Sequence, residues 1–188
     1  MKNYITLVRL YNGYQIMNNI YVTLQSSINS DGLWYPSISI YYSGCDKPIK
    51  CKDCHNPELQ QCNNGFATTS DKLIQDIETI LKDWLNTYNQ MSLCFLGGEP
   101  LAEWNRESVQ KVSEYFKEHY PTQIYNVVYS WRYIEDLQQL KQYIKYMDYG
   151  VLGDFQIENR DVSYIPSSSN QYIYDFNNNI KLPHIKKG

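Results

Sequence analysis

The sequence predicts an α/β fold in which strands of a parallel sheet alternate with helices. Short apolar stretches rich in β-branched and aromatic residues alternate with longer stretches whose apolar residues recur every three or four positions. The first pattern is typical of buried strands and the second of amphipathic helices. Because the connections are short, we expect parallel strands joined by crossover helices. A chain of 188 residues favours one domain with a substantial core.

The expected elements follow one another along the chain. Thr69 offers a hydroxyl N-cap for the first helix, and Asn105 can cap the second. The expected helices span residues 69–88, 105–120 and 134–147. The expected strands are Ser37–Tyr42, Met91–Leu96, Ile124–Tyr129, Tyr149–Leu152 and Gln171–Phe176. Residues 155–169 are expected to form a loop.

The two ends of the chain are set apart from the main domain, which we place at residues 28–176. Residues 1–27 are expected to form an N-terminal extension, with short strands at Tyr4–Leu10 and Ile20–Leu24 along one edge of the sheet. Residues 177–188 are polar and are expected to form a loose C-terminal tail.

Composition and charge exclude several classes of protein. The net charge is −3 and no block of lysine or arginine stands out, so we expect no direct contact with nucleic acid. No apolar run approaches the roughly 20 residues of a membrane helix, and the first residues lack a signal peptide. We therefore expect a cytoplasmic protein without a membrane partner.

The five cysteines are an odd number, which suits a disulfide framework poorly. In a reducing compartment, a tight group of cysteines more often binds metal or acts in catalysis. Cys94 lies in an apolar strand and is expected in the core, whereas Cys62 is expected to be an exposed thiol.

Three cysteines stand directly after the first expected strand of the main domain. Cys45, Cys51 and Cys54 are spaced C-x5-C-x2-C, and no fourth cysteine follows at ligand spacing. Thiolates select zinc, copper(I) or iron–sulfur clusters. A 4Fe-4S cluster held by three cysteines leaves one iron open to a substrate. The alternative is a structural zinc site completed by His55 or Cys62, but a histidine directly after the third cysteine is poorly placed to join it on one ion.

A second motif, Gly97-Gly98-Glu99-Pro100, follows the next expected strand. Both motifs stand at the carboxyl ends of strands, which meet at one edge of a parallel sheet. Sites in parallel α/β folds form at this edge. The sequence therefore predicts that the cysteine loop and the Gly-Gly-Glu-Pro loop lie close together.

The two motifs resemble those of the radical S-adenosylmethionine (SAM) superfamily, whose usual cysteine spacing is C-x3-C-x2-C. Within it, the chain resembles the activating proteins of anaerobic ribonucleotide reductases, which are glycyl-radical activases. Further similar segments are Ile28–Gly32, Cys54–Leu59, Tyr129–Leu137, Asp148–Phe155 and Ser168–Gln171.

Four features depart from the family pattern. Asp53 stands before the third cysteine, where many superfamily members carry an aromatic residue near the adenine. The first cysteine spacing is two residues longer, so the loop must bulge around Pro48. Leu152 stands where the family has an aspartate. The first twenty-odd residues have no counterpart in the smallest activases.

The resemblance implies a fold and a reaction. The fold would be a partial β/α TIM-like barrel of the radical SAM type. Cys45, Cys51 and Cys54 would each bind one iron of a 4Fe-4S cluster, and the amine and carboxylate of SAM would chelate the fourth iron. One electron, from flavodoxin or ferredoxin, would cleave SAM to a 5′-deoxyadenosyl radical. That radical would take a hydrogen atom from a glycine of anaerobic ribonucleotide reductase.

The resemblance also implies the residues that hold SAM. Gly97 and Gly98 would contact its amine through their backbone, with Glu99 helping to hold the positive charge and Pro100 fixing the turn.

Three residues outside that loop are further candidates. Ser130 is placed for the SAM carboxylate or ribose, and Asn170 for the adenine or for backbone contacts. His55 would pack beside the cluster or shape the adenine pocket.

Two other functions stay open on the sequence. The chain could be another small radical SAM enzyme that acts on a small molecule, such as a former of deazaguanine rings, or on a different glycyl-radical enzyme. A deep pocket lined by extra loops would favour the small-molecule enzyme. It could also be a zinc-binding adaptor without catalytic activity, which would be colourless where an iron–sulfur protein is brown.

Overall fold

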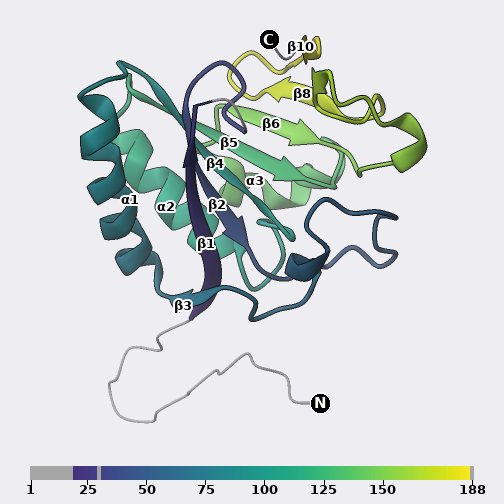
Figure 1. Cartoon of the computed structure of the whole chain (residues 1–188), viewed down its shortest axis with the longest axis horizontal. Coiled ribbons are helices and arrows are strands. Elements are labelled where there is room, and N and C mark those ends of the chain that lie inside the picture. The colour runs from purple at the N-terminus through teal and green to yellow at the C-terminus, as the bar shows by residue number, and fades with distance from the viewer. Residues whose placement is uncertain (1–18, 29–30, 187–188) are drawn as a thin grey trace.

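The computed structural model describes residues 19–28 and 31–186, which form a mixed α/β fold (Figure 1). Its helices are α1 (Ser70–Leu85), α2 (Arg106–His119) and α3 (Lys141–Ile144), with 3-10 turns η1 (Pro57–Gln60), η2 (Asp136–Leu140) and η3 (Ile157–Asn159). Its strands are β1 (Ile20–Ser27), β2 (Ser37–Tyr42), β3 (Phe66–Thr68), β4 (Met91–Gly97), β5 (Ile124–Ser130), β6 (Tyr149–Leu152), β7 (Tyr164–Ile165), β8 (Tyr172–Asp175), β9 (Ile180–Leu182) and β10 (Ile185–Lys186).

The main sheet has eight strands in the order β3-β1-β2-β4-β5-β6-β8-β9. The central strands β2, β4, β5 and β6 are parallel, as the alternation of strands and helices predicts. The outer strands pair antiparallel on both sides. The fold is therefore α/β with a mixed sheet, and the partial TIM-like barrel stays a prediction.

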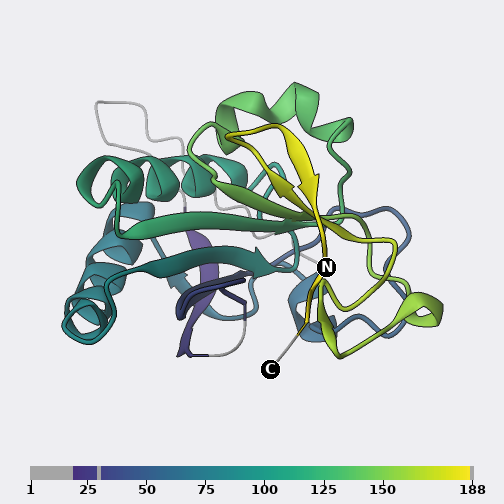
Figure 2. The same cartoon turned by 90° about the horizontal axis from the view of Figure 1, so that it is seen from above.

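The two faces of the sheet are covered differently. All three helices pack against one face, where they form the main core (Figures 1 and 2). The strand residues on this face include Ile38, Ile40, Tyr42, Leu93, Phe95, Val128 and Leu152, and the helix residues include Leu73, Ile77, Leu81, Val109, Val112, Phe116 and Ile144. The other face carries a smaller cluster of Cys94, Leu96, Val127 and Val151, flanked by tyrosines. Because none of the described helices covers this second face, its side chains are available to line a binding site.

The helix signals in the sequence are confirmed for α1 and α2. Thr69 caps α1 by accepting a hydrogen bond from the backbone N–H of Lys72 at 3.3 Å. Asn105 stands at the N-cap position of α2, but its side chain makes no capping bond. It turns toward the loops after β2 and β4 instead.

The predicted third helix over residues 134–147 is wrong as a continuous helix. The chain forms the 3-10 turn η2 and then only four helical residues in α3. Leu140 breaks the helix, because its φ of −112° and ψ of 14° lie outside the helical range. Leu137 and Ile144 are buried all the same, so the apolar pattern predicted burial correctly.

The predicted loose tail is also wrong as far as residue 186. β9 pairs antiparallel with β8, and β10 pairs with β7. β8 would otherwise be an edge strand with unpaired backbone groups, which favours the addition of a further strand. Within residues 155–169, where a loop is expected, η3 and the short β7 form.

The N-terminal prediction can be followed only in part. Ile20–Leu24 lies within β1, which joins the sheet between β3 and β2. The strand expected at Tyr4–Leu10 lies outside the described residues. Among the helices of residues 19–28 and 31–186, none has both the length and the apolar character needed to cross a membrane.

The carboxyl ends of the parallel strands align at one edge of the sheet. Tyr42 at the end of β2 is in register with Gly97 at the end of β4, and Ser130 of β5 is in register with Leu152 of β6. The cysteine loop and the Gly-Gly-Glu-Pro loop therefore leave the sheet side by side, as predicted.

Backbone hydrogen bonds join these two loops directly. The N–H of Gly98 donates to the carbonyl of Tyr42 at 2.7 Å, and the N–H of Glu99 donates to the carbonyl of Gly44 at 2.8 Å. A Cβ at Gly98 would lie 2.4 Å from the carbonyl oxygen of Leu59 and 2.5 Å from that of Gly44. Glycine is needed at position 98 because backbone atoms occupy the space of any side chain.

We expect Gly98→Ala to destabilise the chain by about 2 kcal/mol, since the methyl group would push the backbones of two loops apart. Urea denaturation of the metal-free protein measures this. Glu58→Ala, an exposed change close to the same contact, should stay within about 0.5 kcal/mol of the wild type. Equal stabilities for the two variants would contradict the close packing at Gly98.

Candidate active site

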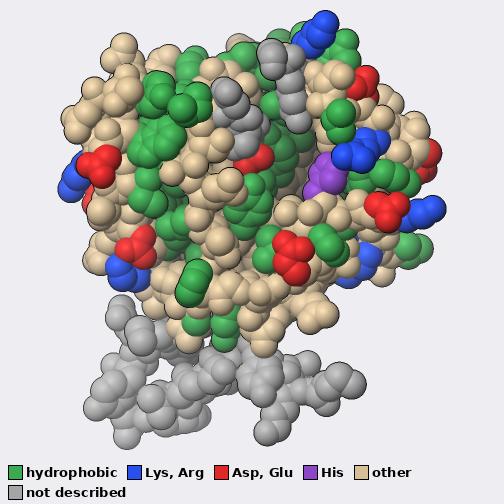
Figure 3. Space-filling model, viewed as in Figure 1, with side chains coloured by type: hydrophobic (Ala, Val, Ile, Leu, Met, Phe, Trp, Pro, Cys, Tyr) green, Lys and Arg blue, Asp and Glu red, His purple; other side chains and the backbone are tan. Residues whose placement is uncertain are grey.

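A pocket of about 430 Å³ opens at the edge where the parallel strands end. Its walls come from the loops after β2, β4, β5 and β6 and from the segment between η3 and β8. Figure 3 shows this face of the molecule hollowed beside a histidine side chain. The volume lies in the range of small-molecule and cofactor sites.

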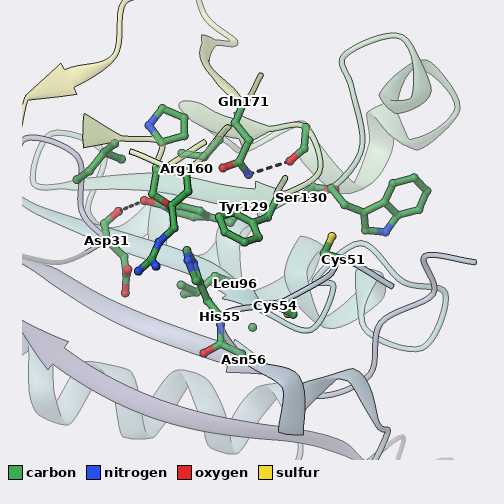
Figure 4. Close-up of a pocket in the computed structure, with 18 of the residues that line it drawn as sticks. Asp31, Cys51, Cys54, His55, Asn56, Leu96, Tyr129, Ser130, Arg160 and Gln171 are labelled. Atoms are coloured by element: carbon green, nitrogen blue, oxygen red, sulfur yellow. Dashed lines mark hydrogen bonds between the residues drawn. The ribbon is translucent and has the colours of Figure 1, made fainter. Parts of the chain in front are cut away.

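The structure brings six of the predicted site residues into the wall of this pocket. They are Cys51, Cys54, His55, Gly97, Gly98 and Ser130. Cys45, Glu99, Pro100 and Asn170 lie outside the wall. Figure 4 shows Cys51 and Cys54 toward one end of the pocket and Asp31 and Arg160 toward the other.

Cys45, Cys51 and Cys54 are free, partly buried thiols in the loop between β2 and η1. Within residues 19–28 and 31–186, no three His, Cys, Asp or Glu side chains converge as they would around one metal ion. A structural zinc needs four donors around one point. In a 4Fe-4S cluster each cysteine binds a separate iron, so the thiolates need not converge on one point. By their chemistry, three closely spaced thiolates are suitable ligands for such a cluster.

Burial and nearby positive charges have opposite effects on the pKa of the Cys45 and Cys51 thiols. Burial raises the pKa of both thiols. The positive charges of Lys50 near Cys45 and of Lys47 near Cys51 act in the opposite direction, as does the backbone N–H of Phe155 at Cys51. These two thiols stay protonated in the metal-free chain at neutral pH, so a metal that binds there must displace their protons.

Glu99 is completely buried behind the pocket rather than exposed in it. Its Oε1 accepts hydrogen bonds from the backbone N–H of Leu101 at 3.0 Å and from the hydroxyl of Ser130 at 2.9 Å. Its Oε2 accepts one from the backbone N–H of Trp131 at 3.2 Å, and Nη1 of Arg132 lies 3.0 Å from Oε1. The carboxyl group thus joins the end of β4 to the end of β5.

Burial raises the pKa of Glu99 to about 7, although the charge of Arg132 and the hydrogen bonds from Leu101 and Ser130 lower it. The free energy lost by removing the carboxylate from water exceeds the stabilisation that Arg132, Leu101 and Ser130 give to its charged form, which is common for buried ion pairs.

Asn105 is a residue that the sequence assigned only to a helix cap. Its amide Nδ2 donates to the carbonyl oxygens of Ser43 and of Glu99, both at 3.0 Å. It therefore holds the chain just before Cys45 against the Gly-Gly-Glu-Pro loop. No local sequence signal distinguishes this role from that of an N-cap.

Asn170 and His55 have different surroundings. The Nδ2 of Asn170 donates to the carbonyl of Asp154 at 2.8 Å, and its Oδ1 accepts from the hydroxyl of Ser168. Both polar ends of Asn170 are thus engaged within the loop after β6, and it is the neighbouring Gln171 that lines the pocket. His55 lies beside Phe155, with ring centroids 4.3 Å apart.

The far end of the pocket is formed by tyrosines that sequence analysis did not single out. The carboxylate of Asp31 accepts a hydrogen bond from Tyr41 at 3.0 Å, and its backbone carbonyl accepts one from Tyr129 at 2.7 Å. Burial raises the pKa of both phenols, so they stay neutral. Tyr41 and Tyr129 alternate with core-facing residues along β2 and β5. This alternation in the sequence could have predicted that they lie on the face opposite the helices.

Comparisons with known proteins agree with this donor set. Residues 29–174 match a family described as a 4Fe-4S single cluster domain, a segment that contains the three loop cysteines and the Gly-Gly-Glu-Pro motif. The anaerobic ribonucleoside-triphosphate reductase-activating protein of Enterobacteria phage T4 is 24% identical over 119 residues, which are 63% of this chain and 70% of the phage protein.

We expect the titration of Glu99 to make the metal-free chain less stable as the pH rises. The pKa of about 7 in the folded chain lies above the value of 4.5 for an ordinary glutamate, so the contribution of Glu99 is fully present below pH 4.5 and is lost as the pH rises through 7. A shift of this size corresponds to about 3 kcal/mol.

Glu99→Gln removes this titration. The difference between the unfolding free energies of wild type and variant, measured by urea denaturation from pH 4 to pH 8, isolates Glu99 from the other acids. Parallel pH curves for the two proteins would contradict the raised pKa.

Proposed function

This chain belongs to the family of 4Fe-4S single cluster domains, and from that premise we propose that it is a radical SAM activase for an anaerobic ribonucleoside-triphosphate reductase. It would hold a 4Fe-4S cluster through Cys45, Cys51 and Cys54, cleave SAM reductively and generate a glycyl radical on the reductase. The observation that carries the proposal is the meeting of cysteine loop and Gly-Gly-Glu-Pro loop at one pocket. The likeness to an activating protein of phage T4 supports the choice of partner.

When bound, the cluster and SAM supply the one-electron chemistry, and the chain supplies position and exclusion of water. Gly97 and Gly98 present backbone without side chains to the pocket, so a ligand can approach them closely. The Ser130 hydroxyl lies in the wall with its hydrogen bonded to Glu99, which leaves it as an acceptor toward a ligand. We assign to Glu99 the role of holding Ser130 next to Gly97 and Gly98, which would contact the SAM amine.

His55 and Asn170 take secondary places in the proposal. His55 lies in the wall directly after Cys54, so we assign it to shaping the adenine side of the pocket. Asn170 would hold the loop after β6 in place rather than contact SAM itself, because its side chain is hydrogen-bonded to Asp154 and Ser168.

The source of electrons and the location follow from the chemistry. We propose flavodoxin or ferredoxin as the donor. We propose the cytoplasm as the location, because a tight group of cysteines that binds metal is typical of a reducing compartment.

A second candidate function has one specific observation in its favour. The segment from Arg160 to Ser167 adds a wall to the pocket, which a small-molecule enzyme would need to enclose its substrate. A radical SAM enzyme that acts on a small molecule is therefore the alternative. A zinc adaptor is less consistent with the sequence, because a histidine directly after the third cysteine is poorly placed to complete a four-donor zinc site with it.

The test is an anaerobic assay of the reconstituted protein. Iron, sulfide, a reductant and SAM are added, with and without anaerobic ribonucleotide reductase from the same source. The proposal expects 5′-deoxyadenosine, together with the doublet of a glycyl radical on the reductase in electron paramagnetic resonance. 5′-Deoxyadenosine without the doublet would favour the small-molecule alternative, and protein that takes up zinc but no iron would overturn both.

We expect Cys51→Ala to abolish SAM cleavage and lower the iron bound per chain, because the cluster would lose a ligand. Cys62→Ala is the matched control, since Cys62 is an exposed thiol outside the pocket. It should keep the iron content and visible absorption of the wild type. Loss of the cluster in Cys62→Ala but not in Cys51→Ala would refute the ligand assignment.

A further inference from the structure

The cysteine loop is longer than the usual radical SAM spacing, yet it is tied to its surroundings at several points. Between Cys45 and Cys51 it contains Asp46, Lys47, Pro48, Ile49 and Lys50. A longer loop has more conformations to lose when it is ordered. The contacts of its charged side chains show how this chain orders it.

Asp46 reaches from the position after Cys45 to the end of β5. Its Oδ1 accepts a hydrogen bond from the indole Nε1 of Trp131 at 3.0 Å, and its Oδ2 accepts one from Nη2 of Arg132. The side chains of Asp46 and Arg132 are 25% and 12% exposed. This pair is mostly shielded from water, so its attraction is screened less than that of a surface ion pair.

Arg132 is shared between two loops. Its guanidinium lies over the ring of Trp131, 4.7 Å from the centroid. Nη1 lies at ion-pair distance, 3.0 Å, from Oε1 of Glu99, although it makes no hydrogen bond there. One guanidinium therefore pairs with a carboxylate of the cysteine loop and with the carboxyl group behind the pocket. Arginine suits this place because it keeps its charge and offers donors in a flat fork.

The two lysines of the loop fold back onto its own backbone. Nζ of Lys50 donates to the carbonyl oxygens of Cys45 at 2.6 Å and of Lys47 at 2.7 Å. Nζ of Lys47 donates to the carbonyl of Ile49 at 2.8 Å and lies 3.4 Å from the carboxylate of Asp154, beyond β6. These bonds give partners to carbonyl groups that the extra residues would otherwise leave to water.

We propose that Asp46 and Arg132 are positioning residues that hold the cysteine loop in its observed arrangement before any metal is bound. The pair anchors the peptide next to Cys45 to the residues that follow β5, so Cys45 keeps its position relative to the sheet although its spacing to Cys51 is long. That the loop is held for a 4Fe-4S cluster rests on the proposed function; that it is held at all rests on these contacts alone.

The first experiment is amide hydrogen exchange of the metal-free chain. We expect Asp46→Asn to speed exchange in residues 46–52 about tenfold, while amides in α1 exchange as in the wild type. Asparagine keeps an oxygen that can accept the hydrogen bond from Trp131, but it lacks the negative charge that pairs with Arg132. Ile49→Ala is the matched control in the same loop, because Ile49 is 82% exposed, and it should leave exchange unchanged.

A double-variant cycle separates the pair from the other contacts of Arg132. In the Arg132→Gln background, Asp46→Asn should change exchange of the loop by less than twofold, because its partner is already gone. Arg132→Lys keeps the charge and should restore part of the protection. Exchange in Asp46→Asn equal to that in Ile49→Ala would overturn the proposal, as would full additivity of the two substitutions.

The second experiment uses the reconstituted protein. Release of iron to a chelator should be about tenfold faster in Asp46→Asn than in wild type or Ile49→Ala. Faster loop exchange with unchanged release of iron would overturn the role in cluster retention. A wild-type chain that assembles no cluster would overturn the proposed function, while the exchange result would still decide whether the pair holds the loop.

Discussion

The arrangement of the active-site edge depends on the buried carboxyl group of Glu99. It stands after β4, yet it accepts hydrogen bonds from Ser130 and from the backbone of Trp131 after β5. Burial raises its pKa to about 7, so its partners only partly offset the lost hydration. A group that is costly to bury keeps its place because donors from two strand ends surround it. Ser130 and Arg132 are both in contact with this carboxyl group, and Arg132 also pairs with Asp46 of the cysteine loop.

The cysteine loop and the Gly-Gly-Glu-Pro loop form one structural unit. The N–H groups of Gly98 and Glu99 bond to the chain around Gly44, and Asn105 donates to the carbonyls just before Cys45 and at Glu99. In the proposed reaction one loop binds the cluster and the other binds SAM. Joining them at the backbone would keep the cluster-binding and SAM-binding segments at fixed positions relative to each other, while the cofactors would supply the chemistry.

The two faces of the sheet have different roles. Helices cover one face and bury its aliphatic residues, whereas the opposite face carries Tyr41 and Tyr129 with their hydroxyls on Asp31. The sequence predicts this division only in part. Alternation along β2 marks Ile38 and Ile40 for the core, but nothing local marks Asp31 as the partner of a tyrosine 98 residues away. That contact exists because residues 31–33, which precede β2, lie against this face of the sheet.

The sequence by itself determined the elements whose cause is local. Thr69 caps α1 through its own side chain, apolar periodicity placed the strands of the parallel core, and the soft, closely spaced thiols of Cys45, Cys51 and Cys54 predicted a metal site. Tertiary structure decided what depends on distant partners: the break at Leu140, the pairing of β9 with β8, and the pairing of buried Glu99 and partly buried Asp46 with Arg132. Periodicity reports which side chains avoid water, because that preference belongs to each residue. It does not report which charged groups meet, because that depends on how loops from separate strands pack.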